Sequence, residues 1–320
     1  MKRHQQILAG LLVLQLILTG VVFWPKPATT GAGALLFSDV TLDEIVSLAI
    51  ADDQGREIVL EKRDETWVMP EAGDYPARSA SITSTLSKTL QLKTGAVVAH
   101  TPGSHTQLKV AENDFVRRVI FETSEGRAYI LYLGSSPSYG ATHIRLEGQD
   151  ETYLVRDLTV YDFSATATSW VDTEYFSVPS AEVTGMTVEN AAGTLRFVKE
   201  GDAWTLEDLG EDEEVDTGQI NTLLNRATSV RMTRPLGKTE TSAYGMEQPN
   251  ATVIVVMTDT TYTLTIGAHD TDAGTYVVKA SNSPYYVAVS DVNMERFVDA
   301  VREQFLVEEP TPTPTPASEE

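Results

Sequence analysis

The sequence predicts an α+β protein with mainly antiparallel sheets, because short strands separated by turn signals alternate with only a few amphipathic helices. Three landmarks in the chain occur twice in the same order. They are a tryptophan strand, a strand that ends in glycine and a tyrosine strand, at Trp67 and Trp204, Gly134 and Gly267, and Tyr153 and Tyr286. The members of each pair lie 137, 133 and 133 residues apart. A period of about 135 residues is too long for a solenoid repeat and matches a whole domain, so we expect two tandem copies of one domain.

The first copy is expected to consist of three strands, a helix, four strands and a short final helix or turn. The run of residues 52–55, Asp-Asp-Gln-Gly, predicts the first hairpin. Ile82, Leu86 and Leu90 lie four residues apart and predict the helix, with Ser79 or Ser81 as its cap. The expected elements are strands at 45–50, 57–60, 66–69, 116–122, 128–133, 143–146 and 153–155, the helix at 81–92, and the final helix or turn at 157–163.

The second copy is expected to repeat this order of three strands, helix, four strands and helix. Asp216 or Thr217 caps a helix whose apolar face carries Ile220, Leu223, Leu224 and Ala227. A final helix is expected at 292–305, with an apolar stripe of Met294, Phe297, Val298, Val301 and Phe305. The expected strands are at 183–189, 194–199, 204–207, 252–257, 262–266, 275–280 and 285–289.

Residues 6–25 contain no charged side chain and are long enough for one transmembrane helix. Lys2 and Arg3 precede this segment, so the positive-inside rule keeps the N-terminus in the cytoplasm and places the rest of the chain outside it. A cleaved signal peptide is the alternative, with the small residues 32–34 as the cleavage site, although these lie well beyond the apolar stretch. We therefore expect a single-pass protein of the cell membrane.

The resulting layout has seven segments. They are a cytoplasmic N-terminus (1–5), a transmembrane anchor (6–25), a spacer (26–41), a first repeat domain (42–165), a connector (166–180), a second repeat domain (181–306) and a disordered Thr/Pro-rich acidic tail (307–320).

The composition limits the classes of partner. The chain has 24 Lys and Arg against 46 Asp and Glu, a net charge of −22, and such a surface repels nucleic acid. High net charge also keeps a protein soluble, and it could attract cations or a basic partner. There is no cysteine, which excludes disulfides, thiolate metal sites and a lipoprotein anchor.

Two groups of side chains could bind a metal ion. Seven acidic residues crowd one loop, and such hard oxygen ligands could hold Ca²⁺, although their spacing is not that of an EF-hand. They are Glu207, Asp208, Glu211, Asp212, Glu213, Glu214 and Asp216. The second group is His269, Asp270 and Asp272. A solvated turn explains the first group and a hairpin turn explains the second, so we expect no metal site.

The remaining polar motifs point to structure rather than chemistry. His100, His105 and His143 have no partner at a metal-ligand spacing. Ser104 precedes His105, but adjacent residues rarely aim at each other, and no nucleophile elbow, phosphate loop or dinucleotide fingerprint is present. Asn250 begins a formal N-glycosylation pattern that we interpret as the start of a strand. No catalytic residue and no cofactor-binding residue is predicted.

Aromatic residues are the other candidates for a ligand site. Trp67 and Trp204 could line a groove, but their equivalent positions favour packing against the helix that follows each of them. Tyr139, Tyr285 and Tyr286 fit either a binding surface or a core.

The repeated pattern resembles the bacterial domain-of-unknown-function family numbered 4340. The resemblance covers roughly residues 42–305. It rests on the tryptophan strand, Tyr75-Pro76-Ala77 before a helix, Tyr244-Gly245-Met246-Glu247-Gln248-Pro249 before a strand, the strand ending in Ile266-Gly267, and the strands at 276–278 and 286–288. The first copy has residues 108–113, Leu-Lys-Val-Ala-Glu-Asn, in place of the Tyr-Gly-x-x-x-Pro element.

The resemblance implies an N-terminal anchor and one or two copies of the domain, and the family has no established activity and no catalytic residues to carry over. It also implies an association with ABC transporter components similar to the gliding-motility type. We therefore expect a non-enzymatic, membrane-anchored extracytoplasmic protein that acts as an accessory or scaffold of a cell-envelope system. The alternative is a carbohydrate- or cation-binding module of the cell envelope.

Overall fold

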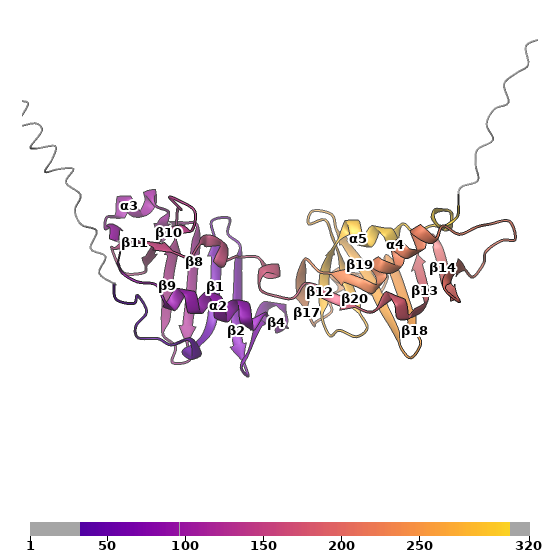
Figure 1. Cartoon of the computed structure of the whole chain (residues 1–320), viewed down its shortest axis with the longest axis horizontal. Coiled ribbons are helices and arrows are strands. Elements are labelled where there is room, and N and C mark those ends of the chain that lie inside the picture. Colours follow the sequence, from indigo (N-terminus) through magenta and orange to yellow (C-terminus); the bar gives the residue numbers. More distant parts are fainter. Residues whose placement is uncertain (1–32, 96, 308–320) are drawn as a thin grey trace, which may run out of the picture.

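The computed structural model describes residues 33–95 and 97–307 and consists mainly of antiparallel sheet with a few helices, as the α+β prediction requires. Two large sheets, of nine and eight strands, are formed by consecutive parts of the chain (Figure 1). The predicted membrane anchor at residues 6–25 and nearly all of the predicted tail lie outside the described residues. Within residues 33–95 and 97–307, every helix is too short or too polar to cross a bilayer.

The first sheet has the strand order β4-β3-β2-β1-β8-β9-β10-β11-β5, and every neighbouring pair is antiparallel. Its strands are β1 (Ile45–Asp52), β2 (Glu57–Arg63), β3 (Thr66–Met69), β4 (Tyr75–Pro76), β5 (Val97–Ala99), β8 (Arg117–Thr123), β9 (Ala128–Leu133), β10 (Ala141–Leu146) and β11 (Thr152–Arg156). The accompanying elements are α2 (Ser79–Leu90), α3 (Pro102–Gln107), the small pair β6 (Val110–Ala111) and β7 (Asp114–Phe115), and the 3-10 turns η1 (Leu42–Glu44), η2 (Pro70–Ala72), η3 (Val160–Asp162) and η4 (Ala167–Ser169).

The second sheet has the strand order β15-β14-β13-β18-β19-β20-β21-β17 and is also antiparallel throughout. Its strands are β13 (Val183–Asn190), β14 (Gly193–Glu200), β15 (Ala203–Leu206), β17 (Arg234–Gly237), β18 (Ala251–Met257), β19 (Thr261–Asp270), β20 (Thr275–Ala280) and β21 (Tyr286–Ser290). The other elements are the pair β12 (Glu174–Ser177) and β16 (Ser229–Arg231), the helices α4 (Thr217–Thr228) and α5 (Asp291–Val298), and the turns η5 (Ser180–Glu182), η6 (Ser242–Tyr244) and η7 (Arg302–Phe305).

One amphipathic helix packs beside the tryptophan strand of each sheet. Helix α2 contacts β3 and buries Ile82 and Leu86, while α4 contacts β15 and buries Leu223. The side chains of Trp67 and Trp204 are 4% and 6% exposed and belong to the core. The predicted burial of both tryptophans is thus confirmed, and burying such large rings is among the strongest apolar contributions to folding.

Three details of the predicted elements are wrong. The helix expected at 292–305 ends at Val298 and is followed by the separate turn η7, because Asn190 Nδ2 donates to the carbonyl oxygens of Phe297 and Ala300 and closes the helix end. Neither Ser79 nor Ser81 caps α2. The cap position is Arg78, whose backbone amide and guanidinium bind carbonyl oxygens of the connector. The expected patterns also omit α3 and the short strands β4, β5, β6, β7, β12, β16 and β17.

The segments between the two predicted domains and before the first one are packed. Phe37 is 2% exposed and its ring contacts Phe121 edge to face. In the connector, Trp170 and Phe176 are buried, and β12 pairs with β16. Residues 33–41 and 166–180 therefore contribute side chains to the cores rather than acting as free spacers.

Candidate functional site

The two sheets meet where β4 and η2 of the first face β17 and β21 of the second. The Tyr285 hydroxyl donates to the Asp74 carbonyl oxygen at 2.8 Å, and the rings of Tyr75 and Tyr285 meet edge to face with centroids 4.6 Å apart. Tyr175 Oη donates to the Tyr285 carbonyl oxygen at 2.6 Å. Burial is the largest of the influences that raise the pKa of Tyr75 to about 12, so its phenol stays neutral in this contact.

A cleft of about 570 Å³ lies beside this contact and is lined by residues of both sheets. This volume falls in the range of sites that hold small molecules or short segments of chain. One wall consists of Arg56, Glu57, Ile58, Met69, Glu71 and Ala72, on β2, on η2 and next to them. The opposite wall consists of residues 233–236 and Tyr244, and residues 165–167 close one end. We call this space the inter-sheet cleft.

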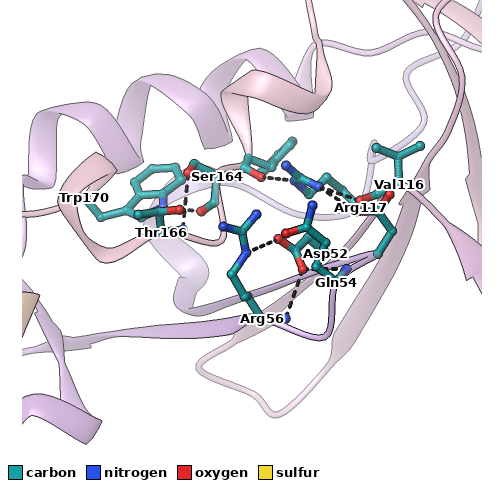
Figure 2. A network of polar contacts seen from close by, with 10 residues as sticks. Asp52, Gln54, Arg56, Val116, Arg117, Ser164, Thr166 and Trp170 are labelled. Carbon is teal, nitrogen blue, oxygen red and sulfur yellow. Dashed lines mark hydrogen bonds and ion pairs between the residues drawn. The ribbon is translucent and has the colours of Figure 1, made fainter. Parts of the chain in front are cut away.

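Arg56 is held in place by a buried carboxylate. Asp52 ends β1, its side chain is 0% exposed, and its Oδ2 accepts from Arg56 Nε at 2.7 Å (Figure 2). Its Oδ1 accepts from the backbone amides of Gln54 and Arg56 at 2.9 and 3.0 Å. Burial alone would raise the pKa of Asp52, but these hydrogen bonds outweigh it and hold the pKa below its ordinary value of 3.8. The carboxylate is therefore charged at neutral pH and orients the guanidinium, whose side chain is 54% exposed.

A second set of hydrogen bonds orders the end of the cleft. Arg117 Nε donates to the Phe163 carbonyl oxygen at 2.9 Å, and Trp170 Nε1 donates to the Ser164 carbonyl oxygen at 2.7 Å (Figure 2). The Ser164 hydroxyl accepts from the Thr166 amide at 3.2 Å. Residues 163–170 thus have fixed backbone positions although they form no regular element beyond η4, and the exposed Thr166 side chain lies beside Arg56.

Four charged side chains line the inter-sheet cleft, and two of each sign are present. They are Arg56, Glu57, Glu71 and Arg234. Within the described residues, no ion pair joins any two of them, and Arg234 makes no hydrogen bond through its side chain. The apolar residues Ile58, Met69 and Pro235 are buried behind them. The cleft therefore offers both carboxylate and guanidinium groups to a ligand above an apolar floor.

A second depression, of about 340 Å³, continues from the cleft over the face of the second sheet. The two spaces share Arg234, Leu236 and Tyr244. The Tyr244 hydroxyl donates to the Leu236 carbonyl oxygen at 3.1 Å, which holds η6 against β17. His269 lies at the far end, with its ring stacked on that of Tyr276 at a centroid distance of 4.2 Å. Arg234 thus lines both hollows.

The acidic loop proposed as a Ca²⁺ candidate is tied to η7 by an arginine. Arg302 donates to both carboxylate oxygens of Glu213, at 2.7 and 2.5 Å, and to the Asp208 carbonyl oxygen. The hydrogen bonds from Arg302 lower the pKa of Glu213 to about 2. Asp216 caps α4 by accepting from the amides of Gly218 and Gln219, as predicted. These contacts support the interpretation as a turn.

The side chains of His105, His143 and Ser104 each make hydrogen bonds of their own, to separate partners. His105 Nε2 lies 2.8 Å from the Asp150 carbonyl oxygen, and the Ser104 hydroxyl pairs with Thr101 instead of with its neighbour. His143 is buried and its Nδ1 lies 2.8 Å from the Ser135 carbonyl oxygen. In the described part of the chain, no three His, Asp or Glu residues are grouped so that they could hold a metal ion.

The other candidates have individual places. The Asp270 carboxylate accepts from the Ala273 amide, as a hairpin turn requires. Asn250 lies directly before β18, and its side chain donates to the Gly267 carbonyl oxygen at 2.7 Å, so the formal glycosylation pattern does begin a strand. Tyr139 is fully exposed, whereas Tyr286 is buried and its hydroxyl donates to Glu240 at 2.6 Å.

No pattern in the sequence points to the inter-sheet cleft. Arg56 follows a turn and Arg234 lies on β17, a strand that was not predicted, so neither belonged to a recognisable motif. The one feature of the sequence that could have drawn attention to these arginines is the scarcity of basic residues, 24 in a chain with 46 acidic ones.

A comparison with protein-family models decides the family. The model described as "Domain of unknown function (DUF4340)" matches residues 67–249, which is more than half of the chain. The chain belongs to the DUF4340 family. The matched region runs from Trp67 to Pro249 and contains all of the cleft residues except Arg56, Glu57 and Ile58. No curated protein and no solved structure matches this DUF4340 chain at a significant level.

Proposed function

We propose that this DUF4340 chain is a non-enzymatic, membrane-anchored extracytoplasmic protein that serves as an accessory or scaffold of a cell-envelope system. The favoured system is an ABC transporter similar to the gliding-motility type. The observation that carries the proposal is the inter-sheet cleft, because its walls come from two separate sheets and its charged groups are left open. In this function, the cleft holds a segment of the partner protein.

We also propose that the two sheets are tandem copies of one domain. The strands β3-β2-β1-β8-β9-β10-β11 of the first sheet have the same connectivity as β15-β14-β13-β18-β19-β20-β21 of the second. The glycines that end β9 and interrupt β19 meet the same obstacle, since a Cβ on Gly134 or on Gly267 would lie 2.0 Å from a backbone carbonyl oxygen of an earlier loop. A cleft between two copies is absent from either copy alone, so duplication creates a new binding surface.

The binding role follows from the chemistry of the lining groups. A guanidinium that a buried carboxylate holds in position loses little freedom when it binds, which favours recognition. The lining combines apolar side chains with a few charged groups, of which Arg56 is held in position, and such a mixture is typical of binding clefts.

Site-specific photo-cross-linking from the cleft tests the partner. A benzoylphenylalanine replaces exposed Thr166, which lines the cleft, or exposed Tyr139, which does not and serves as the matched control. After irradiation of intact cells, Thr166 is expected to yield adducts with envelope proteins that include a transporter subunit, and Tyr139 is not. Identical adducts from both positions, or no adduct from Thr166, would contradict the proposal.

The membrane topology has its own test, because the chain has no cysteine. A membrane-impermeant maleimide should label Tyr139→Cys in intact cells, while Gln5→Cys should react only after the cells are made permeable. Labelling of both positions, or of neither, before permeabilisation would contradict the predicted anchor at residues 6–25.

A further inference from the structure

We infer that the inter-sheet cleft recognises a mixed-charge polypeptide segment, with a carboxylate of the segment on Arg56 and Arg234 and a cationic group on Glu57 and Glu71. This inference rests on the proposed function and specifies the chemistry of the partner segment. It follows from the four charged side chains that line one space without pairing with one another in the described structure.

The two arginines of the cleft, one on each wall, are available to carboxylates. The Nε of Arg56 is occupied by Asp52, and its side chain is 54% exposed, so its outer N–H groups remain available. Arg234 is exposed and makes no side-chain hydrogen bond or ion pair in the described residues, although Glu57 and Glu71 line the same cleft. Arginine binds carboxylates through two parallel N–H donors, which gives direction as well as affinity.

The two glutamates of the cleft and the charge of the whole chain disfavour a purely acidic ligand. The chain carries a net charge of −22, so its long-range field repels a polyanion before contact. Glu57 and Glu71 add local repulsion at the cleft itself. A segment with one carboxylate and one cationic side chain can pair with both kinds of lining group, and the field of the chain attracts its cationic side chain.

The size and the floor of the cleft favour a stretch of chain over a single amino acid. The volume is about 570 Å³, and Met69, Pro235 and Leu236 supply apolar surface. Addition of a further strand to the sheet is disfavoured, because β17 is an edge strand and Pro235 has no N–H to donate. Recognition therefore depends on side chains.

Selection from a random peptide library tests the inference directly. Phage-displayed nonapeptides are selected on the purified full chain in detergent, and the enriched peptides are measured by fluorescence anisotropy. Enriched peptides are expected to carry at least one acidic and one basic residue. Arg234→Gln should weaken their binding by about 10-fold, the usual effect of losing a charge-assisted contact, and Glu71→Gln should weaken it as well.

A charge exchange makes the test specific. Arg234→Glu should abolish binding of a selected peptide, and replacing the acidic residue of that peptide by lysine should restore it. Arg231→Gln is the matched control, because Arg231 is an exposed arginine three residues earlier that does not line the cleft. Equal thermal melting of all variants establishes that they are folded.

Three results would overturn the inference. They are the absence of enriched peptides, enriched peptides that bind Arg234→Gln as tightly as the unmodified chain, and full competition by free glutamate or lysine, which would indicate a small zwitterion. If Thr166 still cross-links to an envelope protein in any of these cases, the proposed function stands and only the charge-based recognition fails. If peptides bind as expected but cross-linking fails, the cleft binds peptide and the envelope partner is wrong.

Discussion

The first strand of each sheet ends in a residue with a short polar side chain, Asp52 in β1 and Asn190 in β13. The two side chains differ in one functional group, since the first carries a carboxylate and the second an amide. In the first sheet, Asp52 accepts from the backbone of its own turn and from Arg56 Nε. In the second, Asn190 Oδ1 accepts from the Ala192 amide at 2.9 Å in the same way, but Nδ2 donates to the carbonyl oxygens at the end of α5. In both sheets, one side-chain oxygen thus closes the turn. The other polar atom, Asp52 Oδ2 or Asn190 Nδ2, bonds to a group outside the turn backbone: the Arg56 side chain in the first sheet and the end of α5 in the second.

The segment that packs beside each side chain explains why one is an amide and the other a carboxylate. Helix α5 ends beside Asn190 and presents carbonyl oxygens, which need a donor. In the first sheet, no α-helix takes that place among the described residues. The Phe163 carbonyl oxygen after η3 is satisfied by Arg117, and Asp52 is free to hold Arg56. The difference leaves Asp52 able to position an arginine at the inter-sheet cleft, which Asn190 does not do in the second sheet.

Two loops of different sequence, one in each sheet, both contain a residue in the left-handed region of backbone conformation. The loop that crosses Gly267 has Gly245 at φ 65°, and the loop that crosses Gly134 has Lys109 at φ 59°. Lysine in this left-handed region is strained relative to glycine. The Tyr-Gly-x-x-x-Pro element and residues 108–113 therefore adopt a related turn, because each must bring a carbonyl oxygen over a glycine of the sheet.

The largest expected effect is at the tryptophans. Trp67→Ala and Trp204→Ala should each lower the free energy of unfolding by about 3–5 kcal/mol, since each removes a buried ring from beside α2 or α4. If the two sheets are equivalent folding units, Trp204→Ala melts the second early while the first keeps its transition, and Trp67→Ala does the reverse. Calorimetry measures this. A variant that keeps its stability but loses a partner would assign the tryptophan to a binding site.

Substitution of Gly134 or Gly267, each of which lies against a carbonyl oxygen of an earlier loop, should have the next largest effect on stability. A Cβ on Gly134 would lie 2.0 Å from the Leu108 carbonyl oxygen, and one on Gly267 would lie 2.0 Å from the Tyr244 carbonyl oxygen. Because backbone must move in both cases, Gly134→Ala and Gly267→Ala should each cost about 1–3 kcal/mol in denaturant unfolding. Gly103→Ala is the control, since its Cβ would meet no atom within 4 Å. An unchanged free energy of unfolding in either variant would contradict the equivalence of the two glycines.

Exchanging the hairpin residues tests the role of the neighbour. Asn190→Asp should cost about 1–3 kcal/mol at pH 7, because a carboxylate cannot donate to the Phe297 and Ala300 carbonyl oxygens. Asp52→Asn should cost about 1–2 kcal/mol, because the ion pair with Arg56 is lost. Urea unfolding of both variants measures these costs.

Measured against the unmodified chain, the cost of each substitution should shrink as the pH falls, for a different reason in each case. The pKa of Asp52 is below 3.8 in the folded chain, so its stabilising effect is complete well above pH 3.8 and is lost as the pH falls through the lowered value. Asp52→Asn should lack this acid-induced loss. Asn190→Asp should gain stability as the pH falls, because the protonated carboxyl group can donate again. A cost that stays constant as the pH is lowered would contradict the role assigned to that residue.

The smallest effects concern the left-handed turn. Gly245→Ala should cost about 1 kcal/mol, whereas Lys109→Gly should stabilise the chain by about 0.5 kcal/mol, since glycine relieves the strain at φ 59°. The exposed pair of Lys109 with Asp114 contributes little to stability and so masks little of this gain. A loss of stability in Lys109→Gly would show that the two turns are held by different forces.

Local patterns predicted the long strands of both sheets, the helices α2 and α4 and the buried tryptophans. The turn after Asp52, the cap at Asp216 and the strand starting after Asn250 were predicted because each depends on neighbouring residues and on the fixed periods of helix and strand. The repeated Gly134 and Gly267 were visible as landmarks, but their reason was not, since the carbonyl oxygens that cross them come from earlier loops.

Only the tertiary structure decided where α5 ends and where a cleft opens. The end of α5 depends on Asn190, which lies more than 100 residues earlier in the chain, and no pattern within residues 292–305 shows it. Likewise, Arg56 and Arg234 line one space only because their two sheets pack against each other. Periodicity reports how a residue relates to its neighbours along the chain, whereas hydrogen bonds and charges between distant segments depend on which surfaces the fold brings together.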